Sequence, residues 1–310
     1  MSRREEFSFL SSNGATIIHG VRWIPDDGNF KAILQISHGM CEHIERYDKF
    51  ARFVADYGIL VVGHDHVGHG KSVRTFEDYG YFGEYPSDIL VEDMHQVRLL
   101  NQTKVPYFML AHSMGSYLLR KYLSTYSNGL SGAVIMGTGY IPYLTIRFGI
   151  LLAIIQGKLM GWRHRSEFLR KLSYSKPYKK FDSYGKDYTN SWLSRDVETV
   201  KSHFNDPMCK FTFTCNGYLG LFEAISYSCK KSNANNISKD LPILLVSGDD
   251  DPVGNLGTGV RKVESMYKKV GIKDVECNLY SEDRHEILNE LDSDIVYQDI
   301  ISWLNLRIKW

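Results

Sequence analysis

Residues 105–116 read VPYFMLAHSMGS, an apolar run typical of a buried strand that ends abruptly at Ser113. Ala111 and Gly115 flank this serine at two residues on either side, close to the Gly-x-Ser-x-Gly pattern of a nucleophile elbow. Ala is small enough for the close approach of strand and helix that the first Gly usually permits. The alternative role for an isolated serine at such a position is a helix N-cap. The hypothesis of a nucleophile therefore depends on partners elsewhere in the chain.

A serine hydroxyl is a weak nucleophile at neutral pH, so it needs a base, which in turn needs an orienting carboxylate. When such an elbow follows a strand, the order along the chain is serine, acid, histidine. His164, His203 and His285 follow Ser113, and only His285 also follows a cluster of acids after a strand. We expect the other two to be surface residues. The acid comes from the three consecutive aspartates of residues 247–252 (SGDDDP), and the residues alone do not decide which.

The negative oxygen of a tetrahedral intermediate needs two backbone N–H donors. The residue after the nucleophile, Met114, is expected to supply the first. The second is expected in the segment ISHGMCEHIERY, residues 36–47, where Met40 follows Gly39. We expect Gly39 to let the chain turn so that the Met40 N–H faces the site.

These residues need a scaffold, and short β-rich runs alternate with amphipathic stretches through the first half of the chain. This alternation predicts βαβ units and a mainly parallel sheet. Two earlier runs joined by SSNG predict an antiparallel hairpin at one edge. Strands are expected at 31–39, 58–65, 105–113, 131–137, 242–252 and 275–285, and helices at 47–57, 87–101, 115–127, 257–270 and 293–308.

Residues 140–240 break this pattern, because they read as helices and loops rich in aromatic and basic residues. We expect a helical cap (lid) inserted over the carboxyl ends of the strands, with residues 1–139 and 241–310 forming the core. Residues 158–180 hold eight basic residues against one acid, Glu167. Such a run is most often a solvated helix face; beside the apolar run 148–155 (FGILLAII), the alternative is contact with an anionic membrane or a phosphate headgroup.

Composition narrows the classes of function. The 37 Lys and Arg residues nearly balance the 36 Asp and Glu residues, so charge gives no reason to expect a nucleic-acid partner. Five cysteines without a Cys-x-x-Cys pair indicate neither a disulfide framework nor a zinc site. The first residues lack the apolar core of a signal peptide, so a cytoplasmic location is expected. The run 148–155 is too short to span a bilayer and belongs to a packed or interfacial helix.

Five segments, taken in order along the chain, resemble the monoacylglycerol lipase and lysophospholipase branch of the α/β-hydrolase superfamily. Members of this branch are often described as serine aminopeptidase-like hydrolases. The resemblance extends over essentially the whole chain. It implies an eight-stranded, mainly parallel sheet flanked by helices with a helical cap. It also implies that Asp251 is the acid, with Asp250 in reserve, that His285 is the base, and that Met40 and Met114 are the oxyanion donors. The segments are HGMCEHIERY (38–47), DHVGHGKS (65–72), AHSMGS (111–116), SGDDDPVG (247–254) and RHEILNE (284–290).

The function expected from these features is a serine hydrolase that cleaves carboxylic esters of lipid-like substrates, monoacylglycerols or lysophospholipids, through an acyl-enzyme. A peptidase or aminopeptidase of the same fold is an alternative that amide substrates would reveal. A catalytically silent binding protein is another, although such scaffolds usually lose a triad member and none is missing here. No metal or organic cofactor is required, and substrate-binding residues are not identified.

Overall fold

The protein is described here by a computed structural model that covers residues 2–308. One sheet of eight strands runs in the order β1-β2-β4-β3-β5-β6-β7-β8. β1 and β2 form the expected antiparallel hairpin, β2 pairs antiparallel with β4, and all remaining pairs are parallel. The strands are β1 (Arg3–Leu10), β2 (Ile17–Ile24), β3 (Ala32–Ser37), β4 (Ile59–His64), β5 (Tyr107–His112), β6 (Gly132–Met136), β7 (Ile243–Gly248) and β8 (Val275–Tyr280). The mainly parallel eight-stranded sheet is therefore confirmed.

The central strands are buried along their whole length because helices cover both faces of the sheet. Every residue of β3, β4, β5, β6 and β7 is buried, which explains their continuous apolar sequences. Charged β1, at one edge, has no buried residue. Charge on an exposed edge strand opposes pairing with other chains.

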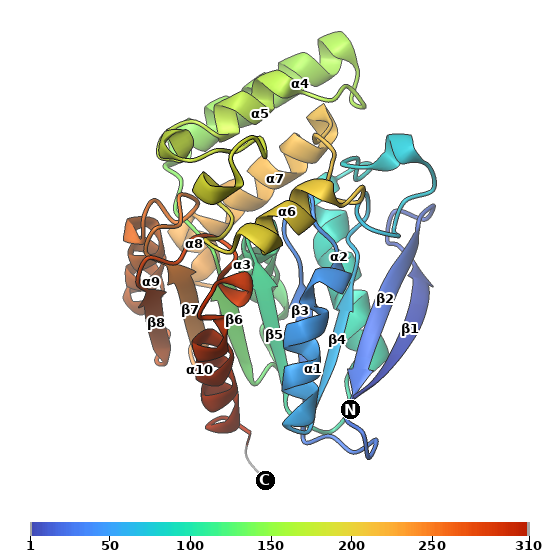
Figure 1. Cartoon of the computed structure of the whole chain (residues 1–310), viewed down its shortest axis with the longest axis vertical. Helices are drawn as coiled ribbons and strands as arrows, with labels where there is room; N and C mark the ends of the chain where they lie inside the picture. Colours follow the sequence, from blue (N-terminus) through green and yellow to red (C-terminus); the bar gives the residue numbers. More distant parts are fainter. Residues whose placement is uncertain (1, 309–310) are drawn as a thin grey trace.

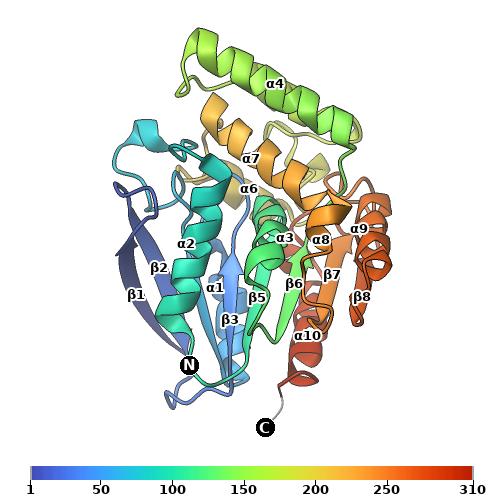
Figure 2. The same cartoon turned by 180° about the vertical axis from the view of Figure 1, so that it is seen from behind.

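Two groups of helices cover the sheet. α1 and α10 cover the face that is in front in Figure 1, where Phe50 packs against Tyr297 with ring centroids 5.0 Å apart. α2, α3 and α9 cover the other face, which Figure 2 shows from behind. The bounds of these helices are α1 (Asp48–Asp56), α2 (Pro86–Asn101), α3 (Met114–Tyr126), α9 (Thr258–Lys269) and α10 (Ser293–Asn305), with short 3-10 turns η1 (Ile44–Tyr47), η2 (Phe76–Asp78) and η5 (Ile287–Asn289).

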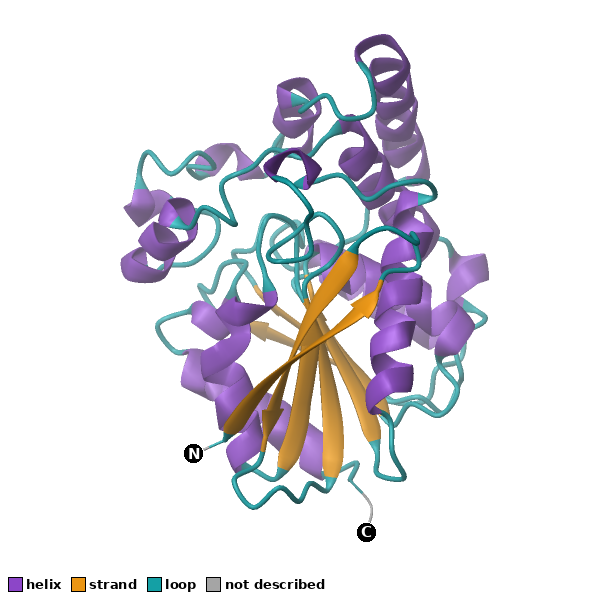
Figure 3. Ribbon diagram, turned by 90° about the vertical axis from the view of Figure 1, so that its right-hand side faces the viewer, coloured by secondary structure: helices purple, strands orange, loops and turns teal. Residues whose placement is uncertain are grey.

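Further helices are inserted between β6 and β7. Figures 1 and 3 show most of this segment beyond the carboxyl ends of the parallel strands. α7 contacts α4 above it and both α2 and α3 of the core, so it joins the outer helices to the sheet layer. Only isolated bridges, and no strand, occur among the described residues of this segment. Its elements are α4 (Tyr143–Met160), α5 (Glu167–Ser173), η3 (Tyr178–Lys180), η4 (Tyr188–Asn190), α6 (Val197–Asn205), α7 (Cys215–Ser228) and α8 (Lys231–Ala234).

The expected site residues all follow strands at the same edge of the sheet. Met40 follows β3, Ser113 follows β5, Asp251 follows β7 and His285 follows β8. Since β3, β5, β6, β7 and β8 are parallel, their carboxyl ends meet at one edge. The topology thus gathers residues that lie up to 245 positions apart in the sequence.

Candidate active site

Ser113 occupies a strained turn between β5 and α3. Its backbone has φ 54° and ψ −119°, a conformation that non-glycine residues rarely adopt. Its N–H donates to the carbonyl of Met136 at 3.0 Å, which ties the turn to the neighbouring strand β6. A Cβ on Gly115 would lie 2.5 Å from the backbone oxygens of Ser37 and His38, so only glycine permits this approach of α3 to β3. The close contact between α3 and β3 therefore explains why the motif has glycine at position 115.

Asp251 and His285 form a buried hydrogen-bonded pair. His285 Nδ1 lies 3.0 Å from Asp251 Oδ2, and both residues are at most 1% exposed. The Ser247 hydroxyl donates to the same Oδ2 at 3.1 Å, and the Val253 N–H donates to Oδ1 at 2.8 Å. These donors fix the carboxylate, which in turn orients the imidazole. The other ring nitrogen, Nε2, is buried and has no hydrogen-bond partner among the described residues.

The three consecutive aspartates have separate roles in the structure. Asp250 forms an ion pair with Lys180 of η3. Asp249 accepts a hydrogen bond of 2.8 Å from the N–H of Glu282. Only Asp251 lies against His285, in agreement with the family spacing.

Ser113 and His285 both lie close to the turn at Gly137, which follows β6. A Cβ on Gly137 would lie 3.0 Å from His285 Cε1, while the preceding Met136 carbonyl accepts the Ser113 N–H. No hydrogen bond joins the Ser113 hydroxyl to His285, two residues that the structure describes. Such bonds are often long in enzymes without substrate and tighten in the reacting complex.

The loop after β3 lies directly against the elbow. A Cβ on Gly39 would lie 2.9 Å from Ser113 Cβ, so this glycine permits the close contact of loop and elbow. The left-handed residue of this loop is Cys41, with φ 55°. Within residues 2–308, no hydrogen bond engages the backbone N–H of Met40 or Met114. Two unused donors beside Ser113 suit a developing oxyanion.

Glu42 is a buried carboxylate of this site that the sequence reasoning missed. It accepts hydrogen bonds from the Gly39 N–H and, at 3.0 Å, from the Tyr47 hydroxyl, and it lies 3.1 Å from His112 Nδ1. Burial opposes its ionisation, but His112 and the Arg46 guanidinium outweigh burial and hold its pKa well below the usual range. Glu42 therefore fixes the loop that carries Met40. The signal in the sequence was its position close to His38-Gly39, in the segment that was expected to hold the second oxyanion donor.

His112, next to Ser113, links this carboxylate to the loop after β8 that carries His285, called the histidine loop below. Its Nε2 lies 3.1 Å from the His285 carbonyl, and its Nδ1 faces Glu42. Burial disfavours the charged ring, yet the Glu42 hydrogen bond outweighs burial and raises the pKa of His112. One charged chain of contacts thus connects the β3 loop, the elbow and the histidine loop.

His203 is not the surface residue that was expected, because its side chain is 12% exposed and its Nδ1 lies 3.9 Å from Glu286. His164 is partly exposed. Burial lowers the pKa of His203 to about 4. Packing of α6 against the His285 loop explains the difference, since a residue in an inserted segment can still face the core.

Aromatic rings from the inserted segment cover His285. The Trp192 ring lies over the imidazole with centroids 4.9 Å apart and planes inclined by 33°. Tyr174 and Tyr178 pack in turn against Trp192. These rings remove water from the histidine and give the site an apolar wall. The sequence signalled aromatic enrichment here without indicating which rings reach the site.

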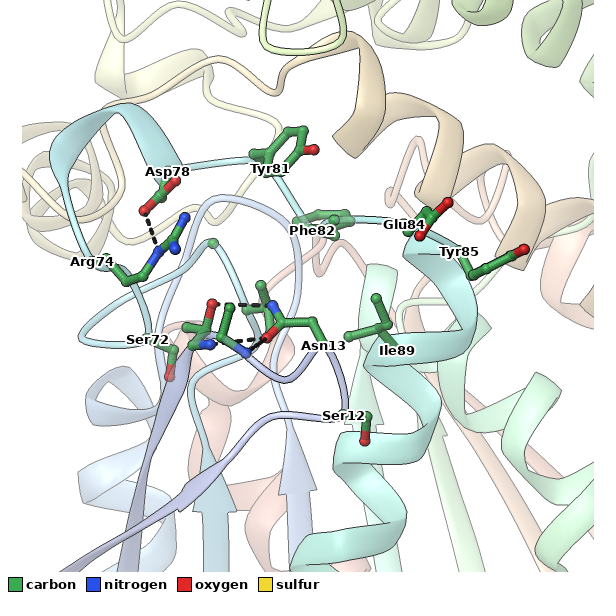
Figure 4. Close-up of a pocket in the computed structure, with 15 residues that line it drawn as sticks. Ser12, Asn13, Ser72, Arg74, Asp78, Tyr81, Phe82, Glu84, Tyr85 and Ile89 are labelled. Carbon is green, nitrogen blue, oxygen red and sulfur yellow. Dashed lines mark hydrogen bonds and ion pairs between the residues drawn. The ribbon is translucent and has the colours of Figure 1, made fainter.

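A cavity of about 300 Å³ lies elsewhere, between the β1–β2 turn, the loop after β4 and the start of α2. Figure 4 shows the Arg74–Asp78 ion pair on one side of it and Ile89 on α2 at another. None of the five expected site residues lines this cavity.

Three clusters of described residues hold potential metal ligands within 4.8 Å of one another. The first combines nitrogen, oxygen and sulfur donors suited to zinc, but its His43 Nε2 and Asp206 Oδ2 already share a hydrogen bond of 2.7 Å. Carboxylates of the third surround the Arg195 guanidinium. The clusters are His43, Asp206 and Cys209; Glu6, His19 and Glu45; and Asp283, Glu290 and Asp292.

The strand order, the serine elbow between β5 and α3 and the helices inserted after β6 define an α/β-hydrolase. Residues 28–292 match the family described as serine aminopeptidase, S33. The chain belongs to this family, in its monoacylglycerol lipase branch.

Relatives of known identity share most of their length with this chain. A monoglyceride lipase of Rattus norvegicus is 39% identical over 289 residues, which cover 92% of this chain and 86% of the relative. A monoacylglycerol lipase of Mycolicibacterium smegmatis is 26% identical over 98% of both chains. A carboxyl esterase from Bacillus coagulans in complex with glycerol superposes with a TM-score of 0.88, 29% identity and full coverage of both chains. These relatives support an enzyme that hydrolyses esters.

Proposed function

We propose that this chain is a serine hydrolase that cleaves monoacylglycerol or lysophospholipid esters through an acyl-enzyme on Ser113. The observation that carries the proposal is the buried Asp251–His285 pair, whose free Nε2 lies at the same strand edge as the strained serine. Residues 140–240 form its cap, and residues 1–139 and 241–310 its core.

In the proposed reaction, the Ser113 oxygen attacks the ester carbonyl carbon while His285 Nε2 accepts the hydroxyl proton. Asp251 keeps the proton on Nδ1 and stabilises the imidazolium. The N–H groups of Met40 and Met114 bind the oxyanion. When the intermediate collapses, His285 gives its proton to the leaving alcohol. Water, deprotonated by His285, then attacks the acyl-Ser113 ester; the bond to the Ser113 oxygen breaks, His285 returns the proton to that oxygen, and the carboxylic acid is released.

The test replaces the nucleophile. Ser113→Ala removes the attacking oxygen, and loss of one triad member costs several orders of magnitude in kcat, about 10⁴- to 10⁶-fold. Turnover of a monoacylglycerol and a lysophospholipid is measured in parallel, together with labelling by a fluorophosphonate probe. Wild-type protein that is neither active nor labelled, or an active Ser113→Ala variant, would contradict the proposal. Turnover of an amide but no ester would favour the peptidase.

We further propose that the cap contacts membranes through the outer face of α4. This 18-residue helix is long and apolar enough, by length and composition alone, to cross a bilayer, and 28% of it is buried. Its inner residues, including Gly149, pack against α7. Its outer face is an apolar stripe with side chains 45–80% exposed, at the spacing of one helix face: Leu144, Phe148, Leu151, Ile155 and Leu159.

The basic residues of the segment 158–180 are less available for contact with an anionic membrane than the sequence indicates. Arg163 pairs with Asp78, Arg170 with Glu167 and Lys180 with Asp250, and Arg165 donates to three backbone carbonyls. Four of its eight cations are thus engaged. We therefore assign most of the proposed membrane affinity to apolar contact, with little dependence on salt.

The membrane proposal is tested by vesicle sedimentation. Leu151→Gln combined with Ile155→Gln should release the protein from vesicles, because both side chains belong to the outer stripe. Leu99→Gln with Leu100→Gln on α2 is the matched control, since these side chains are similarly exposed, 49% and 51%. Equal binding by the two double variants would contradict the proposal.

A further inference from the structure

A short stretch of the cap, residues 191–195, lies along the loop that carries His285. The Glu286 N–H donates to the Leu193 carbonyl at 2.7 Å, and the His285 N–H donates to the Trp192 carbonyl at 3.4 Å. The Ser194 hydroxyl donates to the Asn289 carbonyl at 2.9 Å. Backbone hydrogen bonds therefore join a cap segment to the loop of the candidate general base.

Arg195, at the end of this stretch, holds both ends of the histidine loop. Its guanidinium pairs with Asp283, two residues before His285, with Glu290, five residues after it, at 3.1 Å, and with Asp292 at 2.8 Å. Glu290 also accepts the Arg284 N–H at 2.9 Å, which closes the loop on itself. Arg284 reaches back in turn, donating to the Ser191 carbonyl at 2.5 Å.

Arg195 is the cation that pairs with all three of these carboxylates, Asp283, Glu290 and Asp292. The side chains of Asp283 and Glu290 are fully buried, and Asp283 Oδ2 has no hydrogen-bond partner among the described residues. Removing one partner of a buried ion pair leaves the other charge uncompensated. Without Arg195, the buried Glu290 would lose its cation, and the loop would lose the group that joins its two ends.

The same stretch also fixes the ring above the base. Trp192 precedes Arg195 by three residues, and its ring lies over the His285 imidazole. An anchored Arg195 therefore holds the Trp192 ring over the imidazole as well as the loop beneath it. The cap segment acts on His285 from both sides.

We propose that Arg195 is a positioning residue for His285, so that the cap supplies part of the catalytic geometry as well as a cover for substrate. This inference rests on the proposed function. Arg195 touches neither Ser113 nor the imidazole, and its effect passes through the loop and Trp192.

The experiment compares kcat and KM for Arg195→Gln, expressed per folded molecule. A misplaced base slows the chemical step, so kcat is expected to fall about 10- to 100-fold with KM changed by less than about threefold. Arg195→Lys should show an intermediate kcat, because lysine supplies the charge without the forked donors. Arg163→Gln is the matched control, since it also breaks a cap–core ion pair, with Asp78, away from the histidine loop.

Wild-type kcat in Arg195→Gln would overturn the inference, as would a fall in activity no larger than that of Arg163→Gln. If Arg195→Gln does not fold, Glu290→Gln removes a contact from the opposite side, and full kcat there overturns the inference too. Fluorophosphonate labelling separates the two proposals. An unlabelled wild type contradicts the serine mechanism, whereas a labelled wild type with an unaffected Arg195→Gln contradicts only the positioning role.

Discussion

Three neighbouring aspartates after β7 show how burial and partner separate chemically identical side chains. Asp251 is fully buried and hydrogen-bonded to His285, while Asp249 and Asp250 hold the turn and the cap. The residue type was evident from the sequence, but the partner of each carboxylate depends on where the chain places it.

Asp251→Asn should lower kcat by about 10⁴-fold, because an amide favours the wrong tautomer of His285. Asp250→Asn and Asp249→Asn should each change kcat by less than about tenfold, since their partners are Lys180 and a backbone N–H. Steady-state ester hydrolysis by the three variants decides between them. A crippled Asp250→Asn beside an active Asp251→Asn would move the assignment by one residue.

Glu42→Gln should lower kcat by about tenfold or more with little change in KM, because the loop of Met40 loses the charge that Gly39, His112 and Arg46 surround. Glu45→Gln is the control, as this acid lies in the same turn and pairs outward with Arg4 and Lys71. Kinetics on both variants measure the difference. The same kcat in both would show that the buried carboxylate does not support the oxyanion loop.

At the scale of elements, α3 begins directly after Ser113, the proposed nucleophile, and anchors the inserted segment. Its Arg120, 2% exposed, donates to the Gly139 carbonyl at 2.8 Å and to the Ser228 carbonyl at 3.0 Å. These carbonyls precede α4 and end α7. One buried guanidinium therefore secures the insertion close to both of its ends.

Arg120→Met should destabilise the protein by about 2–4 kcal/mol, because it leaves buried carbonyls without donors. Arg147→Met, at an exposed position of α4, should change the free energy of unfolding by less than about 0.5 kcal/mol. Urea unfolding followed by fluorescence measures both. Equal midpoints for the two variants would mean that Arg120 does not anchor the insertion.

At the scale of the whole molecule, core and cap share one electrostatic system around the histidine loop. Burial, reinforced by Glu290 and Asp292, raises the pKa of Asp283 to about 7, against the opposing effect of Arg195. The folded state therefore binds this proton more tightly than the unfolded chain, whose Asp pKa is near 3.9. The contribution of Asp283 to stability is greatest at low pH and is lost as the pH rises toward 7.

Asp283→Asn should remove this pH dependence, since an amide does not ionise. Relative to wild type, the variant should gain stability between about pH 5 and about pH 8. Urea midpoints at the two pH values measure the shift, with Asp249→Asn as a control on the neighbouring turn. A difference between variant and wild type that does not change with pH would show that Asp283 ionises normally.

The sequence alone was sufficient for those features that depend on local pattern. Continuous apolar runs predicted the buried parallel strands, and a hairpin signal predicted β1 and β2. The elbow motif singled out Ser113, and chain order singled out His285. The predicted strands and hairpin are confirmed because backbone hydrogen bonding and strand burial leave a regular trace in neighbouring residues, whereas the catalytic roles of Ser113 and His285 stay predictions.

Only the tertiary structure decided which side chains meet. On the residues alone, the acid could have been any of three aspartates, and the roles of Trp192 and Arg195 had no local signature. Half of the basic run is engaged in contacts, and the outward stripe of α4 is visible only once α7 covers its other face. Such contacts join segments up to 240 residues apart, as Arg46 and Glu286 do. Their strength depends on burial and distance, which the folded chain alone defines.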